Sequence, residues 1–95
     1  MRRNDGAVVA LLKAVTDRVD PLPELPPAQV CRRLRERAGL SQELVGSVCG
    51  VAHNVVPRWE NGQVNRPLAL AASRRYRALL AFLIAVDEHG SEVTA

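Results

Sequence analysis

The apolar residues of this chain recur mainly at three- and four-residue spacings, and glycine or proline separates one apolar run from the next. This spacing is typical of amphipathic helices, and the short alternating runs typical of strands are scarce. Five helices are predicted, over residues 7–19, 28–38, 42–49, 53–61 and 67–86. We therefore predict an all-α fold, a compact helical domain with one additional amphipathic helix at its N-terminus.

The same pattern divides the chain into four parts. An N-terminal helix (1–19) is followed by a spacer (20–27) that holds four prolines and is therefore expected to be extended and stiff. A helical domain (28–87) comes next, and the residues after it (88–95) are expected to form a flexible tail. A proline-rich recognition ligand is the alternative interpretation of the spacer.

Each long helix has a set of apolar residues expected to face the core. The first helix, which Asn4 or Asp5 would cap, buries Val8, Leu11, Leu12, Val15 and Val19. The second helix buries Val30, Cys31, Leu34 and Ala38. The last helix buries Leu68, Ala72, Tyr76, Leu79, Leu80, Leu83 and Val86. Between Leu79 and Val86 the last helix is apolar all round, so it must be covered on more than one side.

Residues 39–62 have the features of two short helices crossing at a sharp angle. Ser41 is a suitable N-cap for the first of them, and Gly50 is free to take the positive φ that the turn requires. Gly46 is small enough for the place where the two helix axes approach. The residues expected to point inward are Val45, Cys49, Val51, Val56 and Trp59. Such a pair can lay its second helix in the major groove of DNA.

The positive charge of the chain is concentrated around this helix pair. The net charge is +3, but residues 28–77 carry nine arginines against three glutamates, whereas residues 1–27 are neutral and residues 78–95 carry three acidic side chains. This asymmetry is expected of a domain that binds nucleic-acid phosphates. A solvated arginine-rich face is the alternative explanation.

Other classes of protein are not indicated. Cys31 and Cys49 are too few for a zinc module and are expected to be buried thiols, although a bridge between them stays open. No apolar run is long enough to span a membrane and no signal peptide is evident, so we expect a cytoplasmic protein. No nucleophile has a neighbouring base and no loop is built to cradle phosphates, so we predict no enzyme activity and no cofactor or metal.

Three motifs carry a family resemblance. They are Gly39-Leu40-Ser41-Gln42-Glu43, then Gly50-Val51, and then Arg58-Trp59-Glu60-Asn61-Gly62. With the arginine-rich stretch 32–38 before them, they resemble the helix-turn-helix of the phage repressor and Cro-type (Xre-like) family of bacterial regulators. The resemblance covers residues 28–80, and the Trp-Glu-Asn-Gly run is its most specific part.

The resemblance implies a set of DNA-binding residues. Gln42 and Asn61 would meet backbone phosphates, and Arg66 would add a further phosphate contact. His53 and Asn54 would lie at the start of the recognition helix, where His53 donates to guanine and Asn54 pairs with adenine. Arg58, one turn further on, would reach a base or a phosphate. Trp59 is expected in the core, and Glu60 is expected to pair with an arginine of the first helix of the domain, over 28–38.

Two residues depart from the pattern. Ala52 replaces the usual Ser or Thr cap of the recognition helix. Pro57 is expected to remove a hydrogen bond from that helix and to push Val56 away from helical geometry. We therefore expect the helix over 53–61 to be kinked or to begin late.

Two functions follow. The first is a sequence-specific regulator that inserts residues 53–61 into the major groove of double-stranded DNA, as a homodimer on an inverted repeat. Either the N-terminal helix or the apolar segment 79–86 would form the dimer surface, the latter being favoured. The second is a protein-interaction module on the same scaffold, such as an antitoxin that binds a partner toxin.

Overall fold

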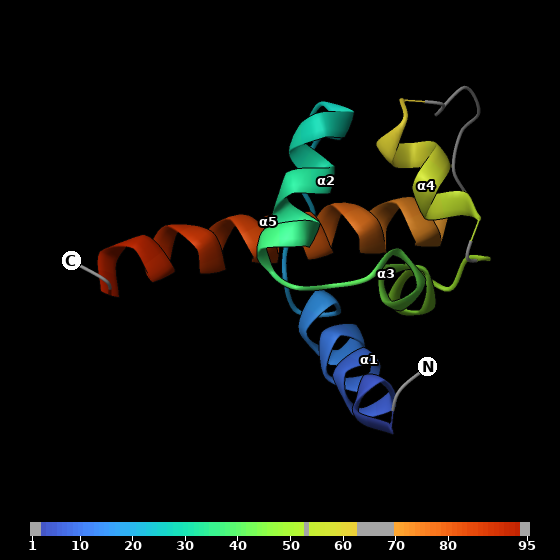
Figure 1. The fold of residues 1–95 in the computed structure, drawn as a ribbon, viewed down its shortest axis with the longest axis horizontal. Coiled ribbons are helices and arrows are strands. Elements are labelled where there is room, and N and C mark those ends of the chain that lie inside the picture. The colour runs from blue at the N-terminus through green and yellow to red at the C-terminus, as the bar shows by residue number, and fades with distance from the viewer. Residues whose placement is uncertain (1–2, 53, 63–69, 94–95) are drawn as a thin grey trace.

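The structure is a computed structural model that describes residues 3–52, 54–62 and 70–93. Its helices are α1 (Arg3–Thr16), α2 (Ala28–Arg37), α3 (Gln42–Cys49), α4 (Val55–Glu60) and α5 (Leu70–Val93). No strand occurs in the described ranges, so the all-α prediction is confirmed. Figure 1 shows α5 lying along the longest axis, with the other helices gathered around one part of it and its C-terminal end extending beyond them.

One hydrophobic core joins all five helices. The side chains of Leu79 and Leu80 on α5 meet those of Val45 and Val48 on α3, and each of these four is less than 2% exposed. All five residues predicted to point inward from the helix pair belong to this core or pack against its edge. Burial of such side chains is the main stabilising term for a domain of this size.

The first helix begins four residues earlier and ends three residues earlier than predicted. It begins at Arg3, so Asn4 and Asp5 lie inside the helix rather than capping it, and it ends at Thr16. Its buried face consists of Val9, Leu12 and Thr16, whereas Leu11 is 62% exposed. The prediction for Leu11 was wrong because residues 7–12 are all apolar, and periodicity cannot select one face of such a run.

The proline-rich spacer is docked on the domain. Leu22 and Leu25 pack against the core. The backbone N–H of Leu22 donates to the carbonyl of Arg77 at 3.3 Å, and the Arg77 guanidinium donates back to the Leu22 carbonyl at 2.9 Å. Arg75 forms an ion pair with Asp17 at 2.8 Å. Two arginines of α5 therefore hold the segment that connects α1 to α2.

The last helix is longer than predicted. It continues past Val86 to Val93, so residues 88–93, expected to belong to a flexible tail, are helical. Gly90 does not end the helix, because a single glycine costs only about 1 kcal/mol relative to alanine. Val86 is 49% exposed rather than buried, since this end of α5 projects beyond its neighbours. Leu68 and the predicted start at Pro67 lie outside the described residues.

Within the described part of the chain, no helix combines the length and the apolar character that crossing a membrane requires.

Candidate nucleic-acid interface

The helix pair α3–α4 begins with a capped helix and turns at a glycine. The hydroxyl of Ser41 accepts a hydrogen bond from the backbone N–H of Leu44 at 3.0 Å, which satisfies one free donor at the start of α3. Gly50 ends α3 with φ +73°, a left-handed conformation that side chains disfavour. The predicted cap and turn residue are both confirmed.

Gly46 lies where α3 approaches the chain that leads into α4. A Cβ atom placed on Gly46 would lie 3.4 Å from the carbonyl oxygen of Val51 and 3.7 Å from a methyl group of Val56. These are ordinary contact distances. A small residue is therefore needed at this position, as predicted, but the site has room for a methyl group.

The recognition helix begins late, and Pro57 is compatible with it. α4 starts at Val55, with Asn54 at the N-cap position, so Pro57 is its third residue. N–H groups in a first helical turn have no helical partner, and Pro57 therefore costs no internal hydrogen bond. Val56 is helical and fully buried. The expected late start is confirmed, whereas the expected loss of a bond and displacement of Val56 were wrong. His53 lies outside the described residues.

The two faces of α4 differ sharply in exposure. Val56, Trp59 and Glu60 are buried, and the Trp59 ring packs on Tyr76 with centroids 4.5 Å apart. This confirms Trp59 as a core residue. Asn54 and Arg58 are exposed, as is Asn61 directly after the helix. Arg58 forms no ion pair or hydrogen bond with any described residue, so its charge is available to a partner.

A buried ion pair fixes α4 against α2. The Nε of Arg35 lies 2.6 Å from one carboxylate oxygen of Glu60, and its Nη2 donates to the other at 3.0 Å. The side chains of Arg35 and Glu60 are 14% and 3% exposed. The hydrogen bonds to Glu60 raise the pKa of Arg35 above its usual value. Glu60 does pair with an arginine of α2, as predicted.

Two further hydrogen bonds extend this pair to α3. Arg35 donates to the carbonyl of Leu40 at 2.8 Å, in the connection before α3. The amide nitrogen of Gln42 donates to Glu60 at 3.1 Å. Sequence reasoning missed the Gln42 contact because it joins residues on two helices that only the fold brings together. Glu60 therefore ties α2, α3 and α4 to one another.

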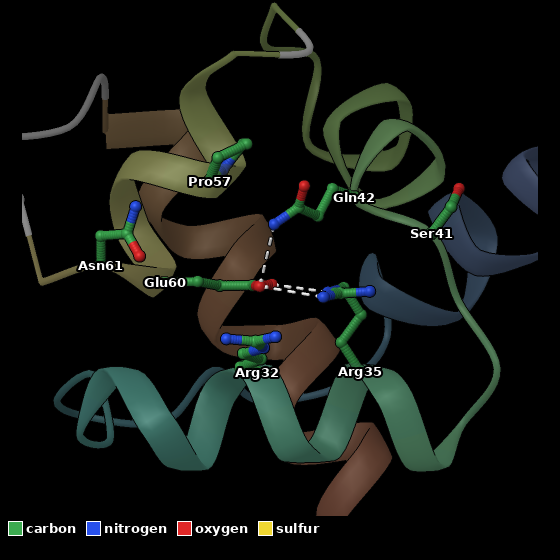
Figure 2. A pocket seen from close by; sticks show the side chains of 7 residues that line it. All are labelled: Arg32, Arg35, Ser41, Gln42, Pro57, Glu60 and Asn61. Carbon is green, nitrogen blue, oxygen red and sulfur yellow. Dashed lines mark hydrogen bonds and ion pairs between the residues drawn. The ribbon is translucent and has the colours of Figure 1, made fainter.

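A polar groove of about 400 Å³ lies beside this network (Figure 2). Its lining residues come from α2, from the start of α3 and from α4, and they are Arg32, Arg35, Ser41, Gln42, Pro57, Glu60 and Asn61. The carboxylate of Glu60 is already neutralised by Arg35. Arg32 donates its Nε–H to Glu36 at 3.0 Å, which leaves its two NH2 groups. Together with the amides of Gln42 and Asn61, these donors suit an anion. Two predicted phosphate contacts, Gln42 and Asn61, thus line one groove.

The other predicted site residues are distributed as follows. Asn54 at the N-cap of α4 and Arg58 about one turn further along the helix are both exposed. Arg66, like His53, lies outside the described residues. Among the described residues, no cluster of three or more His, Cys, Asp or Glu side chains has the arrangement of a metal site.

A model of the helix-turn-helix domain matches residues 28–93. The chain belongs to this helix-turn-helix domain family. No curated protein and no solved structure matches the chain. The match begins at the first residue of α2 and ends with α5, so the family domain includes the groove, the buried ion pair and both helices of the pair. Helix α1 and the spacer precede it.

Proposed function

We propose that this helix-turn-helix protein is a sequence-specific DNA-binding transcriptional regulator that inserts α4 into the major groove. The observation that carries the proposal is the exposure of α4. Arg58 on α4 is exposed, as are Asn54 directly before the helix and Asn61 directly after it. Val56, Trp59 and Glu60 are buried on the opposite face, and the helix lies inside a family match that spans residues 28–93. A helix held in this way is suited to entering a groove as a rigid unit.

Base contacts are assigned to the start and the middle of α4. The amide of Asn54 would pair with adenine, and the unpaired guanidinium of Arg58 would donate to guanine or to a phosphate. His53 is assigned to this set because it directly precedes Asn54. Base contacts specify sequence, so substitutions here should change which sites are bound.

Phosphate contacts are assigned to the groove and its surroundings. Gln42 and Asn61 line the groove, and Gln42 is the first residue of α3, so the positive end of that helix's dipole lies beside the groove. One N–H of the Gln42 amide is used by Glu60, which leaves its second N–H for a phosphate oxygen. Arg66 completes the set. Phosphate contacts set the register, so their loss should weaken binding to all sequences alike.

We further propose that the protein acts as a cytoplasmic homodimer of the phage-repressor type. A recognition helix of six residues makes few base contacts, so useful specificity requires a second copy on an inverted repeat. The half-sites would lie roughly 34 Å apart, which is one turn of the duplex. The favoured dimer surface over 79–86 is wrong in most of its length, because Leu79, Leu80 and Leu83 are buried in the core of a single copy. We propose the projecting end of α5 around Val86, which is 49% exposed, as the dimer surface in its place.

Selection of bound sites from random duplexes tests this function directly. We expect an inverted repeat, and an affinity for it that falls steeply with salt because phosphate binding releases counterions. Arg58→Ala should weaken binding by about 1–3 kcal/mol and relax the sequence preference. Arg18→Ala is the matched control, since Arg18 is exposed and follows α1, which lies on the other side of α5 from α4 in Figure 1.

Three results would contradict the proposal. They are absence of DNA affinity at low salt, equal effects of the Arg58 and Arg18 substitutions, and selection of no common sequence. Stoichiometric capture of one protein partner by a chain without DNA affinity would instead support the interaction module.

A further inference from the structure

A second cavity lies near the C-terminal end of α4, and the described residues that line it differ from those that line the polar groove. Its volume is about 200 Å³. It is bounded by the spacer, the start of α2, the end of α4 and α5, and its lining residues are Leu25, Pro26, Ala28, Cys31, Trp59, Gly62 and Tyr76.

The size of the cavity suits a small ring compound. Apolar cavities of about 150 Å³ stay free of water and bind benzene. The cavity beside Trp59 is somewhat larger, so a single ring or a fused pair such as indole fits within it. The Trp59 and Tyr76 rings, packed at an interplanar angle of 34°, give it two aromatic walls. Aromatic ligands pack well against such walls in offset or edge-to-face arrangements.

The chemistry of the lining selects against charged molecules. No charged side chain lines the cavity among the described residues, and its polar groups are the Cys31 thiol and the Tyr76 hydroxyl. Burial raises the pKa of both Cys31 and Tyr76, and both side chains are therefore neutral at pH 7. An ionised ligand would be buried without a counter-charge, which is costly. The Cys31 thiol already donates to the carbonyl of Pro26 at 3.5 Å, so a neutral, largely apolar ligand matches the site.

We propose that this cavity is a binding site for a small, uncharged aromatic molecule that acts as an effector. Such a ligand contacts Trp59 on α4 and Leu25 in the spacer at once, so its binding energy is shared between the helix pair and the N-terminal segment. The effector role rests on the proposed DNA-binding function. The binding site itself does not.

Titration of the full-length protein with indole and with benzene tests the site. Trp59 is the only tryptophan of the chain, so its indole N–H gives one NMR signal that reports on the cavity wall. We expect this signal to shift saturably with either probe. At ten times the dissociation constant, the ligand should shift the folding equilibrium about tenfold toward the native state. A signal that stays unmoved up to the solubility limit of both probes would overturn the proposal.

A pair of methionine substitutions locates the bound probe. Ala28→Met places a long apolar side chain in the cavity and should weaken benzene binding at least tenfold. Gln29→Met, on the neighbouring exposed position of α2, should leave it unchanged. Circular dichroism checks that both variants are folded. Equal binding by the two variants would place the probe elsewhere and overturn the assignment.

A DNA-binding measurement with and without saturating indole tests the effector role. A change in affinity of threefold or more in the wild type, absent in Ala28→Met, supports it. Unchanged affinity in a protein that binds both DNA and indole removes the effector role alone. Absence of DNA binding contradicts the proposed function. The NMR titration still tests the aromatic binding site in that case, because it does not depend on DNA binding.

Discussion

The N-terminal segment (residues 3–27) and the helix-turn-helix unit (residues 28–93) are held in place by different forces. In the helix-turn-helix unit, Glu60 forms a buried ion pair with Arg35, and its side chain is only 3% exposed. In the N-terminal segment, Asp17 forms an ion pair with Arg75, and its side chain is 60% exposed. Val9 and Leu12 of α1 nevertheless belong to the same hydrophobic core as the helix pair.

The part of the chain that matches the family is shorter than the part that shares one hydrophobic core. The family match begins at residue 28, but the core extends back to α1. Apolar contacts are non-directional, so α1 contributes stability without fixing the orientation of α4. A buried, bidentate ion pair is directional, so Glu60 fixes the orientation of α4 relative to α2 and α3. The four predictions below test this division, from the largest expected effect to the smallest.

Breaking the buried pair should have the largest effect. Glu60→Ala leaves the Arg35 guanidinium without its partner, and we expect a loss of about 3–5 kcal/mol of unfolding free energy. Urea unfolding followed by circular dichroism measures it. The matched control is Glu36→Ala in the exposed Arg32–Glu36 pair, where both side chains are more than half exposed and the expected loss is about 0.5 kcal/mol or less. Similar losses for the two variants would contradict the proposed role of Glu60.

Removing a core contact of α1 should come next. Leu12→Ala creates a cavity in the core, and we expect a loss of about 2–4 kcal/mol. Leu11→Ala, one position earlier on the exposed face, should change stability by no more than about 0.5 kcal/mol. The same urea experiment compares them. If Leu12→Ala proved as mild as Leu11→Ala, α1 would not share the core of the family domain.

Filling the small space in the helix pair should stabilise the protein. Gly46→Ala adds a methyl group at ordinary contact distances and raises helix propensity, so we expect a gain of about 0.5–1 kcal/mol. Thermal unfolding should show a higher melting temperature. Gly50→Ala is the contrasting variant, because its φ of +73° strains any side chain and should lower the melting temperature. A destabilising Gly46→Ala would mean that α3 and the turn cannot accept the methyl group.

Breaking the exposed ion pair of the N-terminal segment should have the smallest effect. Asp17→Ala is expected to cost about 0.5 kcal/mol or less, because water screens a pair in which one side chain is mostly exposed. The cost should shrink further at high salt. Unfolding measured at low and high ionic strength provides the check. A loss as large as that of Glu60→Ala would show that charge, rather than apolar contact, holds the N-terminal segment.

The sequence predicted most of the helix-turn-helix unit, because its signals are local. Residue type alone indicates Ser41 as a helix cap, Gly50 as a turn residue and Trp59 as a core residue. The structure confirms all three. The Glu60 pairing was also predicted, although its partner Arg35 could not be chosen among neighbouring arginines. The angle between α2 and α4 decides which arginine reaches Glu60, and the local sequence does not determine that angle.

Contacts between distant segments could not be predicted. The spacer is held by hydrogen bonds between Leu22 and Arg77, two residues that lie more than fifty positions apart in the sequence. The buried face of α1 was misassigned because its run of apolar residues has no polar side to orient it. Of the candidate site, Asn54, Arg58 and Asn61 are exposed as a recognition surface requires, whereas their roles toward DNA stay predictions.

Pro57 stiffens the chain before it folds. A proline ring fixes one backbone angle even in the unfolded state, and at the third position of α4 that fixed angle agrees with the native one. The unfolded ensemble therefore has fewer conformations to lose when the first turn of α4 forms. For a helix of only six residues, which would not persist alone in water, this smaller loss of conformational entropy favours formation of α4 in the native state.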